Sequence, residues 1–270
     1  METIAELREK LQSEKLEMRK GILGYRFLRR GISIYFTRVL ISTNVRPNQI
    51  TVMTLVSGVA GAACMFFGWL WLGFFLLYLN IVLDAVDGEV ARYKKLFSLR
   101  GAYLDLVNHL AIPGLFFLAT TFFVADVFNA PNIPVLIAGI LGAFALPLLR
   151  ANGDIPSHVF VEIFSKNPEK FPLVARANIG ATTLLSPRNP LHFAYHLRHF
   201  SIMLVVFFLA FLAELLFFPG DSGRPILSPL VVVYAAFLWV YLAREIVSVF
   251  FSVENRISGM RNILKGREKQ

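Results

Sequence analysis

Three aspartates interrupt one of the most apolar parts of this 270-residue sequence, within the stretch DAVDGEVARYKKLFSLRGAYLDLVNH at residues 84–109. They are Asp84, Asp87 and Asp105. Because an ionised carboxylate is costly to bury in a membrane, such residues are normally paired, line a polar cavity or hold a cation. Hard oxygen ligands suit Mg²⁺, Mn²⁺ or Ca²⁺ rather than zinc. The residue types therefore indicate divalent-cation chemistry.

The spacing of these residues predicts two helices that face each other. Two sets have the spacing of one helix face, at i, i+3, i+7 and at i, i+4, i+8: Asp84, Asp87, Ala91, and Gly101, Asp105, His109. A charged break at residues 92–95 separates them, so the second helix can return antiparallel to the first. Small residues on both faces, such as Gly88 and Gly101, would let a ligand or another helix approach closely.

The same stretch resembles the signature of the CDP-alcohol phosphotransferase family, which is DxxDGxxAR, eight residues, then GxxxDxxxD. The matching positions are Asp84, Asp87, Gly88, Ala91, Arg92, Gly101 and Asp105. The spacer at residues 93–100 has the family's length, but His109 stands where the family has a fourth aspartate. A match at this many fixed positions is far more specific than a lone glycine motif. The segment NVRPNQIT at residues 44–51 also looks like the beginning of the family's first transmembrane helix.

The resemblance implies an enzyme of phospholipid synthesis. Such an enzyme moves a phosphoalcohol or phosphatidyl group from a CDP-linked donor to an alcohol acceptor and releases CMP. By the same resemblance, Asp84, Asp87 and Asp105 bind Mg²⁺ or Mn²⁺, which holds the diphosphate of the donor. The residues expected to bind the CDP donor are Asp84, Gly88, Ala91, Arg92, Gly101 and Asp105. The resemblance also implies a homodimer.

His109 is predicted to be the catalytic base, although its replacement of an aspartate leaves other interpretations open. Neutral imidazole can accept the proton of an acceptor alcohol, and His109 lies one turn beyond Asp105 on the same predicted helix face. As a ligand of Mg²⁺ it would be poorer than a carboxylate. Alternatively, the base lies elsewhere in the chain, or turnover has been lost.

Two other functions are alternatives to the enzyme. One is a homologue that binds the CDP donor but is catalytically altered or inactive. The other is a non-enzymatic membrane protein, such as a transporter or channel, with a carboxylate cation site. Arg92 and the glycine pattern favour an enzyme, because they serve a diphosphate nucleotide and have no obvious place in a cation pathway.

The composition predicts an all-α integral membrane protein. Apolar residues make up 56% of the chain, the mean hydropathy is +0.60, and phenylalanine occurs 26 times. Six stretches have roughly the 20 residues that a span needs, at residues 50–67, 70–91, 102–124, 133–149, 200–218 and 226–250. Residues 25–42 alternate apolar and arginine side chains and predict an N-terminal amphipathic helix in the interface plane.

The distribution of positive charge predicts the orientation of the spans. The net charge is +9, but alternate loops are basic and the others nearly free of Lys and Arg. Both termini and the loop at residues 92–100 are therefore expected in the cytoplasm, which places the signature near the cytoplasmic face. Because the charge follows the loops in this way, no nucleic-acid partner is predicted.

The chain is expected to form one membrane domain with short flanking parts. Residues 1–49 would hold cytoplasmic and interfacial helices, and residues 50–253 the six-helix domain. That domain would include a long cytoplasmic connection at residues 151–199, and residues 254–270 would be a basic cytoplasmic tail.

An acceptor that carries a phosphate would be bound by a cytoplasm-facing arginine, because a guanidinium fork matches phosphate oxygens. The candidates are Arg29, Arg30, Arg38 and Arg46. Interfacial anchoring to lipid is the alternative role for each of them.

Overall fold

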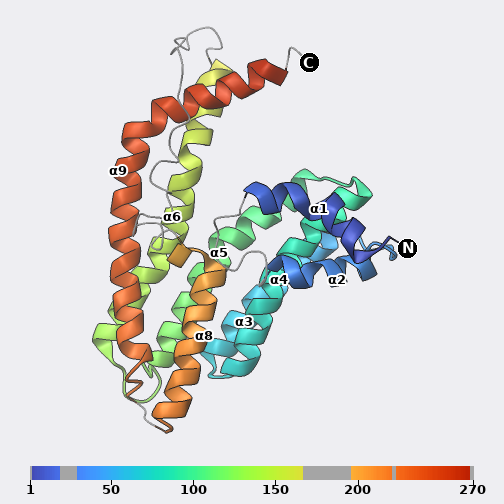
Figure 1. Ribbon diagram of the computed structural model, residues 1–270. Helices are drawn as coiled ribbons and strands as arrows, with labels where there is room; N and C mark the ends of the chain where they lie inside the picture. The colour runs from blue at the N-terminus through green and yellow to red at the C-terminus, as the bar shows by residue number, and fades with distance from the viewer. Residues whose placement is uncertain (1, 19–28, 167–195, 221–222, 268–270) are drawn as a thin grey trace.

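A computed structural model describes residues 2–18, 29–166, 196–220 and 223–267 of the chain. Over these residues the regular elements are helices (Figure 1). In chain order they are α1 (Ile4–Met18), α2 (Gly31–Leu40), α3 (Pro47–Phe66), α4 (Leu70–Lys94), α5 (Leu99–Val124), α6 (Ile133–Lys166), α8 (Phe200–Phe217) and α9 (Leu227–Arg267).

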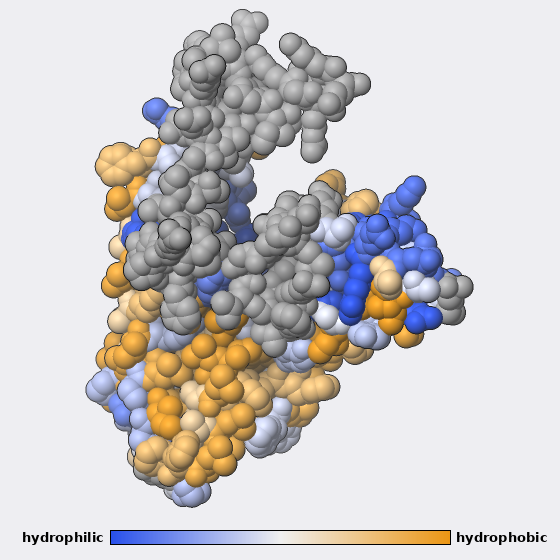
Figure 2. Space-filling view, viewed as in Figure 1, coloured by the Kyte–Doolittle hydropathy of each residue, from blue (hydrophilic) through white to orange (hydrophobic). Residues whose placement is uncertain are grey.

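Six helices in the described ranges are long and apolar enough to cross a membrane. They are Pro47–Phe66, Leu70–Lys94, Leu99–Val124, Ile133–Val159, Phe200–Phe217 and Leu227–Glu254. The predicted all-α fold with six transmembrane helices is therefore confirmed. On the face drawn in Figure 2, apolar residues cover the lower part of the bundle, and hydrophilic residues gather around the N-terminal helices.

The first three spans form the part of the bundle that carries the signature. α3 packs against both α4 and α5. Two glycines let α3 and α4 approach closely, because a Cβ added at Gly73 would lie 2.3 Å from Met65 Cγ and 3.1 Å from the carbonyl oxygen of Gly61. Small residues have this role where helices pack in membranes.

The remaining spans surround an aromatic core. α6 packs along α5 and α9, and α8 packs against α4 and α9. The rings of Phe116 and Phe117 both meet Phe207 edge to face, with centroids 5.6 and 5.7 Å apart. Such aromatic pairs stabilise a fold beyond the area that they bury. This core fixes the positions of α4 and α5 relative to the later helices.

A buried carboxylate joins α8 to α9 at the end of the bundle where these two helices are connected. Glu214 is 1% exposed, and its Oε2 accepts the backbone N–H groups of Ile226 and Leu227, both at 3.0 Å. These donors begin α9 and have no partner within the helix. A negative charge at this position is also favoured by the helix dipole. Glu214 therefore acts as a cap within the fold.

α2 has its polar side turned inward and its apolar side outward. Ser33 and Thr37 are fully buried against the rest of the molecule. The exposed side chains of this helix are Ile32, Tyr35, Phe36 and Val39. This outward apolar face is what an interfacial helix needs. The predicted helix at residues 25–42 begins outside the described residues, and its place at a membrane surface stays a prediction.

Two of the predicted flanking segments are partly helical. Residues 151–166, the beginning of the predicted long connection, continue α6, which contains Pro147 and Pro156. Residues 167–195 of that connection lie outside the described residues. α9 runs on to Arg267, so the described part of the predicted tail is helical as well. The division of the chain into these parts stays a prediction.

Candidate active site

The turn between α4 and α5 sets the two signature helices antiparallel. Lys95 ends α4 in the left-handed conformation, with φ 54°. Ser98 caps α5, since its Oγ accepts the backbone N–H of Gly101 at 3.0 Å. The same hydroxyl donates to Asn48 Oδ1 at 2.7 Å and so ties the turn to the first turn of α3. The sequence around the charged break thus fixes how the two faces meet.

The residues that match the family signature line one cavity of about 650 Å³. This volume is in the usual range for small-molecule sites. The cavity is lined by all seven of them together with His109: Asp84, Asp87, Gly88, Ala91, Arg92, Gly101, Asp105 and His109. Further lining comes from α3, through Asn48 and Thr51, and from α6, through Arg150.

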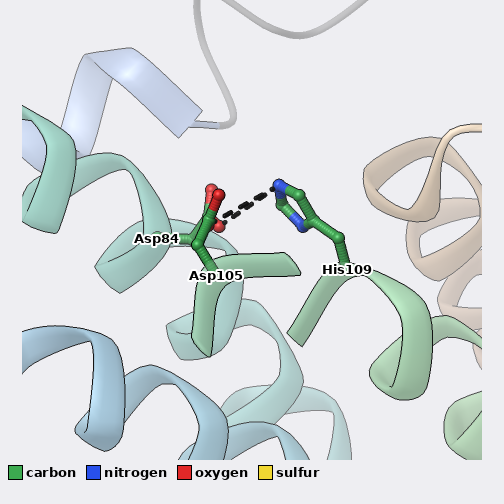
Figure 3. Close-up of side chains that lie close together, drawn as sticks. All are labelled: Asp84, Asp105 and His109. Carbon is green, nitrogen blue, oxygen red and sulfur yellow. Dashed lines mark ion pairs between the residues drawn. The ribbon is translucent and has the colours of Figure 1, made fainter. Parts of the chain in front are cut away.

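Three of these side chains converge on one point in the cavity (Figure 3). The possible ligand atoms of Asp84, Asp105 and His109 all lie within 4.8 Å of one another. His109 Nε2 is 3.6 Å from Asp84 Oδ1 and 3.8 Å from Asp105 Oδ1. Within the described structure, Asp84 Oδ1 is buried and accepts no hydrogen bond. Because such an oxygen is costly to leave unsatisfied, the donor set fits a divalent cation.

Asp87 lines the same cavity but is directed toward α3. Its Oδ2 accepts a hydrogen bond from Thr51 Oγ1 at 3.1 Å. Of the three aspartates predicted to bind metal, Asp84 and Asp105 are thus grouped with His109. Asp87 lies outside that group in the described residues.

Two of the four arginines predicted to bind an acceptor line the cavity. Arg29 forms an ion pair with Asp84, and Arg30 forms one with Glu89 at 2.5 Å. Arg38 and Arg46 do not occur among the described residues that line it. Arg92, predicted to bind the donor, lines the cavity and donates from Nε to the carbonyl oxygen of Leu11 at 3.2 Å.

The two signature glycines keep space open in different ways. A Cβ at Gly88 would have Arg92 Nη1 as its contact among the described atoms, at 3.4 Å. A methyl group there would therefore occupy space that a ligand could use. A Cβ at Gly101 would lie 2.6 Å from Asn48 Oδ1 and 3.2 Å from Ser98 Oγ. Gly101 is thus needed for the contact between α5 and α3.

The sequence analysis did not single out two polar features, a buried amide pair behind the site and one arginine in its lining. Asn80 is buried, and its Nδ2 donates to Asn108 Oδ1 at 2.8 Å and to the carbonyl oxygen of Thr54 at 2.7 Å. This link joins α3, α4 and α5 one turn before Asp84. The sequence signal for Asn80 and Asn108 was that each is an amide side chain inside a predicted span. The signal for Arg150 was its place as the first cation after the predicted fourth span.

Comparison with known proteins points to one family. A sequence model of the CDP-alcohol phosphatidyltransferase family matches residues 44–197, more than half of the chain. A bifunctional IPC transferase and DIPP synthase of Aquifex aeolicus (strain VF5) is 44% identical over 61 residues, which are 23% of this chain. The matched region spans 14% of the length of that relative.

Two crystal structures of phosphatidylinositol phosphate synthase from Mycobacterium tuberculosis share the fold. The apo form is 17% identical with a TM-score of 0.52, and the match covers 80% of this chain and 94% of that one. The form with CDP-DAG bound is 18% identical with a TM-score of 0.53, over 82% and 94% of the two chains.

Proposed function

Since the chain belongs to the CDP-alcohol phosphatidyltransferase family, we propose that it transfers a phosphoalcohol or phosphatidyl group from a CDP-linked donor to an alcohol acceptor and releases CMP. The observation that carries this proposal is the convergence of the whole donor signature on one cavity, where a buried carboxylate oxygen of Asp84 accepts no hydrogen bond from the described residues. A structure of similar fold holds CDP-DAG, which supports a CDP-linked lipid as donor.

The donor would be bound by its diphosphate. Mg²⁺ or Mn²⁺ would be held by Asp84 and Asp105, with Asp87 beside them, and when bound it neutralises phosphate charge and stabilises CMP as the leaving group. The guanidinium of Arg92 is suited to the phosphate oxygens of the donor. Gly88 and Ala91 leave room for the donor, because their side chains take up little of the cavity.

His109 would take the proton of the acceptor alcohol. The hydroxyl oxygen attacks the β-phosphorus in line, the bond between that phosphorus and the oxygen shared with CMP breaks, and Nε2 accepts the proton. Asp84 and Asp105, at 3.6 and 3.8 Å from Nε2, would orient the ring and stabilise its protonated form. The grouping of all three side chains also supports a second role, in which His109 is a ligand of the cation.

An acceptor that carries a phosphate would meet Arg29, a cavity arginine two residues before α2 that pairs with Asp84. Arg29→Gln should raise the KM for a phosphorylated acceptor and leave the KM for the donor unchanged. Arg38→Gln and Arg46→Gln remove the same charge away from the cavity and serve as matched controls. An equal response in all three variants would indicate a general surface effect rather than acceptor binding.

The deciding experiment measures CMP release by the purified protein from labelled CDP-diacylglycerol with a panel of alcohol acceptors. Release should require one acceptor of the panel and should stop in excess EDTA. Undiminished turnover in EDTA would overturn the metal assignment. Binding of the donor without CMP release from any acceptor would instead favour the donor-binding homologue with an altered centre, the function that the exchange of aspartate for His109 leaves open.

We also propose the placement of the protein in the membrane. The chain would lie with both termini and the cavity at the cytoplasmic face, where CDP-linked donors are made. The basic loop at residues 92–100, part of which lines the cavity, supports this orientation. A homodimer is the expected state of assembly.

A further inference from the structure

A second buried carboxylate lies inside the signature, and it is fully engaged. Glu89 is 0% exposed and follows Gly88 directly. Its Oε1 accepts from Arg30 Nη1 at 2.5 Å, Ser33 Oγ at 2.8 Å and Gln12 Nε2 at 2.9 Å, and its Oε2 accepts from Thr37 Oγ1 at 2.6 Å. We call these five residues the Glu89 cluster. The donors come from α1, from α2 and from Arg30, the residue that precedes α2.

The Glu89 cluster is separate from the cavity but adjoins it through its arginine. Glu89 is absent from the described residues that line the cavity, whereas Arg30 is among them. A carboxylate with this many charge-assisted and hydroxyl donors is held in one position. Its contacts fix α1 and α2 against α4.

Two cavity arginines depend on these docked helices. Arg29 is the neighbour of Arg30 in the chain and pairs with Asp84. Arg92, three residues after Glu89, donates from Nε to the carbonyl oxygen of Leu11, one residue before Gln12 in α1. The direction of both guanidinium groups is therefore set by elements that the Glu89 cluster holds in place.

We propose that Glu89 is a positioning residue of the cavity, which docks α1 and α2 against α4 and thereby directs two arginines into it, Arg92 for the donor and Arg29 for the acceptor. This role presupposes the CDP-dependent transfer proposed above. Apolar contacts among Leu7, Leu11 and Ile34 also hold α1 to α2, but they do not reach the carboxylate. Loss of Glu89 would leave Arg30 buried without its counter-charge, which is strongly destabilising for a buried pair.

The kinetic test is Glu89→Gln, with Glu214→Gln as the matched control. Both carboxylates are buried and accept hydrogen bonds from other helices, but Glu214 caps α9 away from the cavity. Glu89→Gln should raise the KM for the CDP donor by about tenfold or more, because Arg30, buried without its counter-charge, undocks α1, the helix whose contact directs Arg92 toward the donor. Glu214→Gln should leave that KM unchanged. Equal donor KM values in wild type and Glu89→Gln would overturn the proposal.

A second measurement is independent of activity. Leu7→Cys, in a Cys64→Ser background, places a thiol at a position that is 0% exposed in the α1–α2 contact. Its labelling by a soluble maleimide should become about tenfold faster when Glu89→Gln is added, because local undocking exposes the thiol. Unchanged labelling would show that Glu89 does not dock these helices. If wild type releases no CMP, the proposed function fails, and this labelling still decides the docking.

A rescue variant tests whether the undocking comes from a buried arginine that has lost its counter-charge. Glu89→Met combined with Arg30→Met replaces the buried pair by apolar side chains, a change that is often neutral where loss of one partner is not. The double variant should recover slow labelling at Leu7→Cys. Its readout is labelling and not KM, because Arg30 itself lines the cavity. Labelling as fast as in Glu89→Gln would show that loss of the counter-charge of Arg30 is not what undocks the helices.

Discussion

Between residues 84 and 89, α4 carries two kinds of buried carboxylate. Glu89 has side-chain donors for both oxygens, all supplied by the N-terminal part of the chain. Asp84 pairs with Arg29 through Oδ2, while its Oδ1 accepts no hydrogen bond from the described residues and faces His109. The two carboxylates differ in whether one oxygen accepts no hydrogen bond from the described residues and so can bind a ligand. A fully engaged carboxylate fixes structure, and one with an unsatisfied oxygen in a cavity can bind a cation.

The contrast shows why burial alone does not identify a site. Glu89, Glu214 and Asp84 are all buried acidic residues in apolar helices. Glu214, like Asp84, has one buried oxygen that accepts no hydrogen bond from the described residues, so the donors and the surroundings together separate the three roles. The other oxygen of Glu214 caps α9, whereas Asp84 lies in the cavity beside Asp105 and His109. Natural proteins leave polar groups incompletely satisfied where function requires it, at some cost in stability.

The largest effect is expected at the two carboxylates that are grouped with His109. Asp84→Asn and Asp105→Asn should each lower CMP release by about 10⁴-fold, because a cation contributes several kcal/mol of charge stabilisation to such a transfer. The melting temperature of Asp105→Asn should hold or rise, since the change removes negative charge from the cavity, whereas Asp84→Asn also breaks the ion pair with Arg29 and should lower it. Binding of Mn²⁺, followed by electron paramagnetic resonance, should weaken in parallel. Wild-type turnover in both variants would show that Asp84 and Asp105 hold no catalytic cation, and would leave no functional difference between them and Glu89.

His109 tests whether the group next to those carboxylates is a base. His109→Ala should slow turnover by about 10²–10⁴-fold, the usual contribution of a general base, while the Kd for the CDP donor is retained. His109→Asp restores the residue of the family signature and should keep substantial activity. If His109→Ala instead abolishes Mn²⁺ binding, the imidazole acts as a ligand of the cation. Wild-type turnover of His109→Ala would place the base elsewhere.

Substitution by alanine should have different effects at the two signature glycines, because Gly88 faces open space and Gly101 faces a packed contact. Gly88→Ala should leave the melting temperature nearly unchanged and raise the donor KM by about tenfold, since its methyl group enters the cavity. Gly101→Ala should also lower the melting temperature, because its Cβ would displace Asn48 from Ser98. Equal stability losses in both variants would contradict the open space at Gly88.

The smallest effect on catalysis is expected at the cap of α9. Glu214→Gln keeps an oxygen that can accept the N–H groups of Ile226 and Leu227 but loses the negative charge at the start of the helix. Unfolding should become easier by about 0.5–2 kcal/mol, the range found for caps and helix-dipole partners. Turnover at a temperature well below melting should match wild type. A loss of turnover there would mean that the far end of the bundle is coupled to the cavity.

The sequence predicted those parts of the fold and site that depend on local spacing. Six apolar stretches predicted the six spans, and helical spacing placed Asp84 and Asp105 on faces that meet in the structure. The charged break at residues 92–95 also predicted the turn between the two signature helices, because its residues are contiguous in the chain. Such features follow from the period of a helix and the length of a span.

The sequence did not predict contacts made across the chain. Glu89 was not singled out, because its donors lie 52–77 positions away and their spacing to it has no period. The direction of Asp87 toward Thr51 depends on how α3 packs against α4. The pairing of Arg29 with Asp84 depends likewise on the docking of α2. Each of these contacts is set by tertiary packing, which a single sequence does not encode in any local pattern.

The residues that donate hydrogen bonds to Glu89 indicate where the smallest part of this chain that can fold on its own begins. The family match starts at residue 44, whereas every side-chain donor described for Glu89 comes from residues 12–37. A truncation at the homology boundary would keep the complete signature and strip its buried glutamate of those donors. We therefore expect the part of the chain that folds cooperatively to begin before residue 44, where the sequence similarity begins. An expression series shortened from the N-terminus should lose folded yield before it loses any residue of the family match.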